Sequence, residues 1–408
     1  MIRVTLAALA LSTTAAVQSP APPFELPAPT GKSPIGTTRW VVTDASRQET
    51  FAPGKKRDIE VVAWYPAASP SSHPAPYIRD SMEEVLSFAR LAKLGDAFNG
   101  LALVRTHASI DAVPASSPSR LPVIVFQHGY TGLPSSHTAL LEDLASHGWA
   151  VLHVIHPYEA TGAMLSDGSV VTFTDEKNTM RARIMDVLNE WKAEGSTMDK
   201  VTAATTDADR ESLMRGYLRT LTHTNEVVSR WTLDVQYVLD HLPKAGAPGR
   251  VTATLDLGRL GVAGHSMGGV AGANFCLVDR RCKAALNLDG IPQYGAMIDT
   301  PMPAPMLMVY SARAGRAGAS DIIYKQSART YTRVDVQDTL HLDFTDMNFW
   351  GGPLRQRGAY GKIDPARAAD VTRSIAREFF GQAILKQPSA FLSGKQALTG
   401  VTVIEIKK

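Results

Sequence analysis

Cysteine is scarce in this sequence, since its 408 residues include only Cys276 and Cys282. Two cysteines exclude a small fold held by a disulfide framework, and they exclude a four-cysteine zinc site. The two residues lie six positions apart (282 − 276 = 6). A local bridge and a pair of reduced core thiols are both compatible with this spacing, and the sequence leaves the two open.

A large excess of charge of one sign is also missing. Lys and Arg number 42 and Asp and Glu number 39, which leaves a net charge of +3. So small an excess is not the electrostatic footprint of a nucleic-acid-binding protein. The phosphate-binding patterns G-x-x-x-x-G-K-[ST] and G-x-G-x-x-G do not occur either. We therefore expect no nucleic-acid partner, no metal or other cofactor, and no obligate protein partner.

Apolar runs of about 18 residues, typical of membrane-spanning helices, are absent. The start of the chain instead shows the three regions of an export signal. Arg3 gives the basic region, Val4 to Leu11 an apolar core too short to span a bilayer, and Ser12 to Ala16 small residues for cleavage. Residues 1–16 are therefore predicted to be a signal peptide of an exported protein, periplasmic or secreted. Residues 17–38 form a Pro-rich leader, expected to be an extended linker.

Strand and helix patterns alternate along residues 39–390, which predicts one α/β domain with a mostly parallel central sheet flanked by helices. Leu121 to Gln127, for example, is a continuous apolar run, as expected for a strand buried on both faces. Residues 158–224 are rich in charge and helix formers and predict a helical insertion, and 391–408 are expected to form a C-terminal extension. Further strands are expected at 39–42, 59–64, 149–155, 260–263, 284–288, 304–310 and 331–336, and helices at 80–102, 136–147, 226–242, 270–278 and 365–384.

The clearest local signal is the run Gly264-His265-Ser266-Met267-Gly268-Gly269. It follows one predicted strand and opens a predicted helix. A strained strand-to-helix turn of this kind exposes a serine hydroxyl for attack, and it needs glycines where side chains would clash. The N-terminus of the helix favours the negative charge that develops there. Ser266 is therefore the predicted nucleophile.

A nucleophilic serine needs a histidine base and an acid that orients the base. With this motif the chain order is serine, acid, histidine, and His341 is the only one of 11 histidines that follows Ser266. The predicted acid is Asp289, because it directly follows a buried strand and its side chain would point out at the strand's carboxyl end.

Three other aspartates follow Ser266 at positions worth weighing. Asp321 is the alternative acid because it follows the next strand, although it lies eleven residues past Tyr310 (321 − 310 = 11) in a loop rich in Gly, Ala and Arg. Asp343 and Asp346 are close to the histidine in sequence, and we expect them to be solvated or to cap a helix.

Attack by the serine creates an oxyanion, which needs two preorganised N–H donors. One is expected from Met267, the residue after the nucleophile, and the other from Tyr130 in the loop after the first fully buried strand. His128 lies in that loop upstream of the nucleophile, and we expect it to shape the loop rather than to act as a base. His153 and His156 project to opposite faces of their strand, so they do not predict a metal pair.

At these motifs the sequence resembles the platelet-activating-factor acetylhydrolase family, of the lipoprotein-associated phospholipase A2 type with its bacterial relatives. The resemblance implies an α/β-hydrolase fold, a triad of Ser266, Asp289 and His341, and oxyanion donation by the backbone amides of Tyr130 and Met267. It runs in order through Ile35-Gly36, Glu60 to Tyr65, Val123 to Tyr130, Asp143 to Gly148, Gly264 to Gly269, Leu286 to Asp289, His341 to Asp346 and Ile363-Asp364.

Two departures leave alternatives open. The insertion 158–224 does not match the family well. The elbow with Met267 also resembles bacterial cutinases and polyester hydrolases, whose acid would correspond to Asp321 here. Bacterial relatives of this type are also described as dienelactone-hydrolase-like.

The sequence therefore predicts an exported α/β-hydrolase that acts as a serine-dependent carboxylic ester hydrolase. Its expected substrates are short-acyl esters or short sn-2-acyl phospholipids. A cutinase-like or dienelactone-hydrolase-like esterase is the alternative, and a binding protein on a hydrolase fold with a dead site is a further one. The shape of the pocket is expected to depend on the insertion 158–224 and the helix 80–102. The amphipathic stretches 80–102 and 180–220 are expected to be core-packed or solvated, with transient lipid contact as the alternative.

Overall fold

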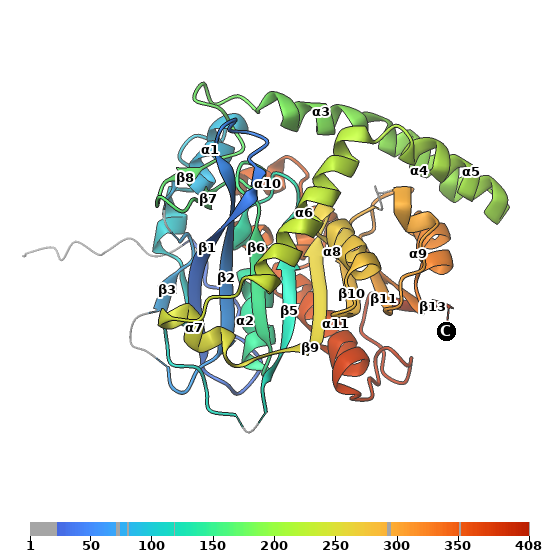
Figure 1. The fold of residues 1–408 in the computed structure, drawn as a ribbon. Helices are drawn as coiled ribbons and strands as arrows, with labels where there is room; N and C mark the ends of the chain where they lie inside the picture. Colours follow the sequence, from blue (N-terminus) through green and yellow to red (C-terminus); the bar gives the residue numbers. More distant parts are fainter. Residues whose placement is uncertain are drawn as a thin grey trace, which may run out of the picture.

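A large mixed sheet forms the middle layer of the molecule (Figure 1). The computed structural model describes residues 23–70, 74–79, 81–117, 119–291, 295–350 and 352–407, so the predicted signal peptide lies outside it. Within these residues the sheet has 11 strands, in the order β13-β12-β11-β10-β9-β5-β6-β2-β1-β4-β3. The strands are β1 (Ile35–Gln48), β2 (Lys56–Pro66), β3 (Pro74–Pro76), β4 (Arg105–Ile110), β5 (Leu121–Gln127), β6 (Ala150–Ile155), β9 (Leu255–His265), β10 (Cys282–Leu288), β11 (Met306–Tyr310), β12 (Tyr331–Val336) and β13 (Val401–Lys407).

The centre of the sheet is parallel. Neighbouring strands from β6 through β5, β9, β10 and β11 to β12 all run in the same direction, whereas β13 and β2 join antiparallel. Every residue of β5 is buried, as its continuous apolar run predicts. The carboxyl ends of the parallel strands meet at one edge, which is where ligands bind in open α/β sheets. The predicted fold class is confirmed.

Helices cover both faces of the sheet (Figure 1). On one face, α6 (Thr222–Asp240) and α8 (Met267–Val278) bury an apolar core that includes Trp231 and Phe275. On the other, α2 (Thr138–Ser146) and α11 (Pro365–Leu385) bury Leu144 and Phe380. The other helices are α1 (Glu83–Leu91), α3 (Ala182–Glu190), α4 (Glu194–Ala203), α5 (Asp207–Leu218), α7 (Gly246–Thr252), α9 (Asp321–Ser327) and α10 (Gly352–Gln356), with 3-10 turns η1 (Asn99–Leu103), η2 (Pro134–His137), η3 (Trp191–Ala193), η4 (Gly295–Ile298), η5 (His341–Phe344) and η6 (Asp346–Trp350).

Two predicted helical regions differ from the structure. Within 80–102 the helix α1 is short and is followed, after a turn, by η1. Within 158–224 a two-stranded sheet of β7 (Ala163–Met164) and β8 (Val170–Val171) precedes three separate helices, α3, α4 and α5, which run in a row across one end of the sheet (Figure 1). Both regions bury apolar side chains, among them Val85 and Ile184.

The second half of the predicted leader is packed structure rather than a linker. Residues 23–34, here called the N-terminal strap, lie against the domain: Leu26 is buried, and Phe24 stacks on Phe349 with ring centroids 5.9 Å apart. Thr30 N donates to Asp143 Oδ1 at 2.7 Å, and Arg373 Nη1 donates to the strap carbonyl of Ala28 at 3.0 Å. A Pro-rich segment makes no internal hydrogen bonds, so its backbone groups are available to such partners.

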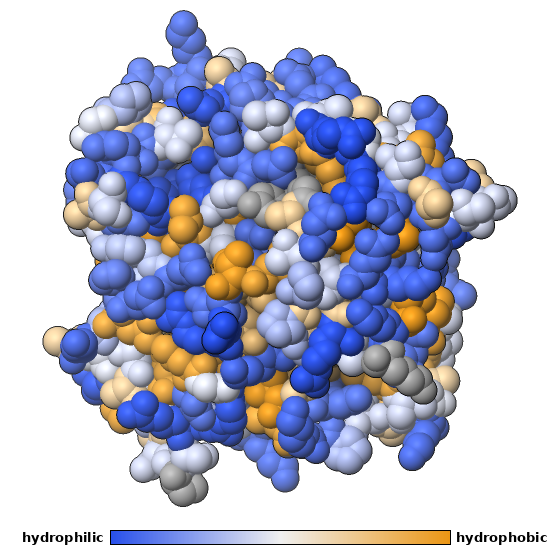
Figure 2. Space-filling model, turned by 45° about the vertical axis from the view of Figure 1, so that its right-hand side comes forward, coloured by the Kyte–Doolittle hydropathy of each residue, from blue (hydrophilic) through white to orange (hydrophobic). Residues whose placement is uncertain are grey.

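The C-terminal residues also belong to the domain, because β13 forms the edge of the central sheet beside β12. Cys276 and Cys282 form a disulfide that joins the end of α8 to the start of β10. Among the residues that the structure describes, no helix has the length and apolar character needed to cross a bilayer. On the face shown in Figure 2, apolar side chains gather in several separate patches between polar ones.

Candidate active site

Ser266 occupies a strained turn between β9 and α8. Its backbone has φ 55° and ψ −126°, which residues other than glycine rarely adopt. The turn also requires close backbone approach. A Cβ added at Gly264 would lie 2.2 Å from the carbonyl carbon of Gly268, and one at Gly268 would lie 2.2 Å from the carbonyl oxygen of Gln127. The predicted elbow is therefore present, with Ser266 at the N-terminus of α8.

His341 and Asp289 are joined by a hydrogen bond across 52 residues of sequence. Nδ1 of His341 lies 2.7 Å from Oδ2 of Asp289. Because an ionised carboxylate only accepts, Nδ1 carries the proton and Nε2 is left as the basic nitrogen. Ser266 and His341 line the same cavity. The structure thus brings the three predicted triad residues into one place.

The Asp289 carboxylate is buried, and both of its oxygens accept hydrogen bonds. Ser311 N donates to its Oδ1 at 2.8 Å and Ser311 Oγ donates to its Oδ2 at 2.9 Å, while the Arg313 guanidinium lies 2.8 Å from Oδ2. Burial acts to raise the pKa of Asp289, but the hydrogen bond with His341 and the charge of Arg313 outweigh it and hold the pKa below the ordinary value. Asp289 therefore stays ionised beside the histidine.

Asp321, the alternative acid, has other partners. It begins α9, where its Oδ1 accepts from the Tyr331 hydroxyl at 2.7 Å and its Oδ2 from Arg333 at 3.1 Å. Burial raises the pKa of Asp321, in contrast to the lowered pKa of Asp289. The geometry therefore favours Asp289 as the partner of His341.

Asp343 and Asp346 are buried, so the expectation that they are solvated is wrong. The expectation of capping fits both. Asp343 Oδ2 accepts from Leu340 N at 2.6 Å at the start of η5, and Asp346 Oδ2 accepts from Ala139 N at 3.1 Å in the first turn of α2. Both therefore fix the loop that carries His341, rather than serving as its acid.

The two predicted oxyanion donors both lie close to Ser266. Met267 is the first residue of α8, so its N–H is one of the four that a helix leaves without an intrahelical partner. Tyr130 lies in the loop after β5 and lines the same cavity as Ser266. That loop approaches the elbow closely, because a Cβ added at Gly129 would lie 3.2 Å from Cβ of Ser266.

His128 is the first residue of this loop, and its buried ring bonds only to groups of the chain, Gly129 O and His156 N. Burial lowers its pKa well below the ordinary value, and the neighbouring His156 adds to the effect, so the ring is neutral. His156 instead bonds Asp234 through Nδ1 at 2.8 Å. No group of three or more potential metal ligands occurs in the described ranges of the chain.

One residue that sequence reasoning missed is His265, although it stands inside the elbow motif. Its Nε2 donates to the backbone carbonyl of His341 at 2.9 Å, and the two rings lie 4.4 Å apart. Burial lowers the pKa of His265 well below its usual value. The neutral ring therefore helps to hold the segment that carries the base. The only feature of the sequence that could have indicated this role is the position of His265 directly before the nucleophile.

The cavity at Ser266 has a volume of about 190 Å³. Its apolar walls come from α1, through Val85 and Phe88, and from the segment after His341, which includes Trp350. The predicted part of 80–102 in shaping the pocket is therefore confirmed. The predicted part of 158–224 is largely wrong, since only Thr161 of that range lines the cavity. The helices α3, α4 and α5 instead run across the end of the sheet without lining this cavity (Figure 1).

The fold is that of the α/β-hydrolase class, and the site holds a serine, a histidine and an aspartate in the chain order typical of that class. Within that class, residues 74–389 match the sequence pattern of the family described as "Platelet-activating factor acetylhydrolase, isoform II". The chain belongs to this family, and the resemblance noted from its motifs is confirmed.

The chain is also similar to two individual proteins. The platelet-activating factor acetylhydrolase of Cavia porcellus is 22% identical over 274 residues, which are 65% of this chain and 58% of that protein. The chain thus matches less than two thirds of that relative's length. A solved ferulic acid esterase from Streptomyces cinnamoneus is 29% identical, with a TM-score of 0.69, and the match covers 93% of this chain and 99% of that one.

Proposed function

We propose that this protein is a carboxylic ester hydrolase that works through a covalent acyl-enzyme on Ser266. The observation that carries the proposal is the bond between His341 Nδ1 and Asp289 Oδ2, at 2.7 Å, with His341 lining the same cavity as the elbow serine. This is the arrangement that nucleophilic catalysis by a serine requires.

The reaction would proceed in two halves. Ser266 Oγ attacks the ester carbonyl while His341 Nε2 takes its proton, and the backbone amides of Met267 and Tyr130 stabilise the oxyanion. Asp289 keeps the imidazole in the required tautomer and supports its positive charge. His341 then protonates the departing alkoxide. Water, activated by the same imidazole, releases the acid and restores the serine.

The size of the cavity supports substrates with short acyl groups. Pockets for drug-sized ligands occupy roughly 300–1,000 Å³, whereas this cavity holds about 190 Å³. Short-acyl esters, including phospholipids with a short sn-2 chain, are therefore the proposed substrate class, in line with the family. Turnover of a phospholipid with a short sn-2 chain would test whether the substrate class extends to lipids.

An ester of an aromatic acid is the second candidate substrate. The observation that favours it is the comparison with the Streptomyces esterase, which is more similar in sequence than the guinea-pig relative and matches over more of the chain. The aromatic wall at Phe88 and Trp350 would suit such a ring. A cutinase-like site is less well supported, because its acid would be Asp321, which bonds Tyr331 and Arg333 instead.

The decisive experiment measures hydrolysis of p-nitrophenyl esters of increasing acyl length, a short sn-2-acyl phospholipid and methyl ferulate. Ser266→Ala should abolish turnover. Its thermal unfolding midpoint should stay close to that of the wild type, because only one hydroxyl is removed. Labelling of Ser266 by an organophosphonate provides the same test without a substrate. Wild-type activity in Ser266→Ala would refute the assignment, and absence of labelling in the wild type would point to the dead-site binding protein.

We further propose that the protein is exported, which the pattern of residues 1–16 supports. The disulfide between Cys276 and Cys282 fits an oxidising compartment. The N-terminal sequence and cell fraction of the mature protein test this. An uncleaved chain in the cytoplasm would contradict the proposal.

A further inference from the structure

The loop that carries Tyr130 is fastened to one neighbouring turn, residues 156–161. Thr131 N donates to the carbonyl oxygen of Glu159 at 2.8 Å, and Thr161 N donates to that of Gly132 at 3.0 Å. Thr131 is held with φ 55°, a conformation that costs about 1–3 kcal/mol and persists only where the surroundings enforce it. The turn therefore imposes the shape of the loop on the C-terminal side of the Tyr130 amide.

A second fastening reaches the loop on the N-terminal side. His156 N donates to Nε2 of His128 at 3.1 Å. Since Nε2 accepts, the proton of the neutral ring is on Nδ1, which donates to the carbonyl of Gly129 at 2.7 Å. The amide of Tyr130 thus lies between Thr131, which is bonded directly to the turn, and Gly129, which is linked to it through the His128 ring.

The turn is itself held from inside by the side chain of Glu159, which is completely buried. Its carboxylate accepts from Trp231 Nε1 at 3.0 Å and from Arg230 Nη2 at 2.5 Å. Arg57 lies 3.5 Å away and also binds Asp234, the partner of the His156 ring, at 2.6 Å. One buried charge network therefore holds the turn at two points, His156 and Glu159.

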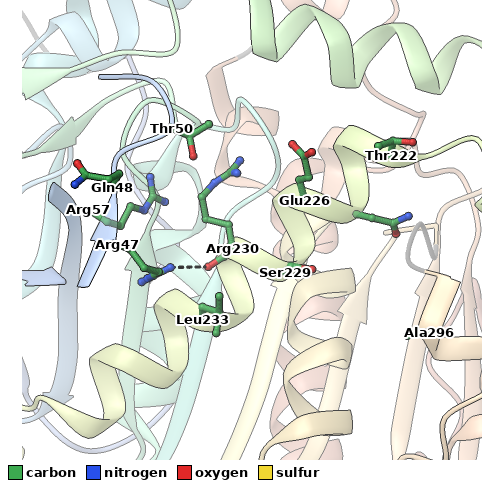
Figure 3. Close-up of a pocket in the computed structure, with 11 residues that line it drawn as sticks. Arg47, Gln48, Thr50, Arg57, Thr222, Glu226, Ser229, Arg230, Leu233 and Ala296 are labelled. Carbon is green, nitrogen blue, oxygen red and sulfur yellow. Dashed lines mark hydrogen bonds between the residues drawn. The ribbon is translucent and has the colours of Figure 1, made fainter. Parts of the chain in front are cut away.

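The outer side of this network faces a separate cavity of about 720 Å³ (Figure 3). Arg47, Arg57 and Arg230 point toward one another there, from the β1–β2 region and from α6. Each of them is paired with a carboxylate of the chain, Asp44, Asp234, Glu49 or Glu159. Because these charges are balanced internally, the cavity has no unpaired cation among these three to attract an anion.

The energetics point to positioning rather than to stability. Replacing a buried ion pair by packed apolar residues is often neutral or even stabilising, so such a network is weak evidence for stability. An oxyanion donor, by contrast, must be placed within about 0.5 Å of its productive position. A charge network that fixes the turn, with the turn linked to Thr131 directly and to Gly129 through His128, meets that requirement.

We propose that Glu159 is a positioning residue for the oxyanion hole: its buried carboxylate fixes the turn 156–161, and through Thr131 and His128 that turn aims the Tyr130 amide at the reacting carbonyl. The inference rests on the proposed function, because it assigns a role in the same reaction. Glu159 itself touches no substrate and lies outside the cavity at Ser266.

The test compares Glu159→Gln with Glu49→Gln. Both changes remove one buried negative charge, and both residues pair with Arg57, but Glu49 directly follows β1 and has no bond to the loop that carries Tyr130. Glu159→Gln should lower kcat at least ~10-fold, since small misplacements of catalytic groups cost up to ~10²-fold. KM should stay unchanged, and binding of a trifluoromethyl ketone, whose adduct on Ser266 places an oxyanion in the hole, should weaken in proportion to kcat. Glu49→Gln should leave both quantities unchanged even where it lowers the unfolding midpoint as much.

A second series applies if Glu159→Gln does not fold. His128→Leu removes both hydrogen bonds of the His128 ring, to His156 N and to the Gly129 carbonyl, whereas His128→Asn keeps a donor for Gly129 and should recover part of the lost kcat. His153→Leu is the matched control, because His153 is equally buried next to His128 and makes no bond to the loop. Equal losses of kcat in Glu159→Gln and Glu49→Gln, or in His128→Leu and His153→Leu, would overturn the positioning role. A wild type that neither turns over esters nor is labelled at Ser266 would instead overturn the proposed function and the inference with it.

Discussion

Replacing Asp289 by asparagine should remove nearly all activity while leaving the fold intact. In the structure Asp289 Oδ2 receives the proton-bearing Nδ1 of His341 at 2.7 Å. An asparagine whose Oδ1 keeps the bond from Ser311 N would place its NH₂ group against that nitrogen. The amide then donates, so the imidazole proton moves to Nε2 and the ring can no longer accept the proton of Ser266. A tautomer held in this wrong form costs up to ~10⁴-fold in kcat.

In energetic terms this loss is about 5.4 kcal/mol of transition-state stabilisation, at ~1.36 kcal/mol for each factor of ten. The assay is kcat and KM on p-nitrophenyl acetate, with thermal unfolding measured beside it. Asp321→Asn is the matched control, because Asp321 is also paired with an arginine and a hydroxyl but has no bond to His341. Its kcat should stay near that of the wild type. An Asp289→Asn enzyme with kcat within tenfold of the wild type, or a larger loss in Asp321→Asn, would refute the assignment of the acid.

Three further predictions concern the pocket, a buried acid and the strap. Phe88→Ala widens the cavity wall and should shift the preferred acyl chain to longer lengths, by about fourfold in kcat/KM per methylene, at ~0.8 kcal/mol per buried CH₂; an unchanged chain-length profile would contradict this. Burial raises the pKa of Asp346 well above its ordinary value, so the folded state keeps a proton that the unfolded chain has released, and the stability it contributes falls as pH rises between the two values. Asp346→Asn should therefore raise the unfolding midpoint at neutral pH more than at acidic pH, and a gain of equal size at both would refute the reasoning. Leu26→Ala should cost ~2 kcal/mol in urea unfolding, at the low end of buried Leu→Ala changes, and no loss would show that the strap does not stabilise the domain.

The sequence was informative where chemistry is tied to a local pattern or to chain order. Ser266 and Met267 stand in a motif whose glycines are required by backbone contacts, and those contacts are found in the structure. His341 followed from order alone, since no other histidine lies downstream of Ser266. The parallel strands were equally visible, because burial on both faces leaves an uninterrupted apolar run such as β5.

Partners that meet only in space could not be predicted. Ser311 and Arg313 hold Asp289 from the loop after β11, and nothing in their sequence context marks them. Glu159 lies in the predicted insertion, where the sequence pattern is typical of solvated charges. Only the folded chain brings Arg230 and Trp231 to its carboxylate. The prediction that residues 158–224 shape the pocket was wrong for the same reason. Composition indicates helices, but it does not indicate which part of the sheet they cover.

The N-terminal strap has a consequence for the order in which the chain assembles. In the unfolded chain Ala28 and Arg373 are 345 residues apart, and closing so long a loop costs about 5 kcal/mol by the (3/2)RT ln n relation, apart from its constant. Once β1 is in the sheet from Ile35, the strap is tethered only seven residues away (35 − 28 = 7), and most of that cost has already been met by the domain. The N-terminal strap should therefore dock last, after α11 has packed. Cleavage by a protease within 23–34 would then report whether the domain is complete. A chain truncated before α11 should be cut in the strap, whereas the intact chain should be protected there.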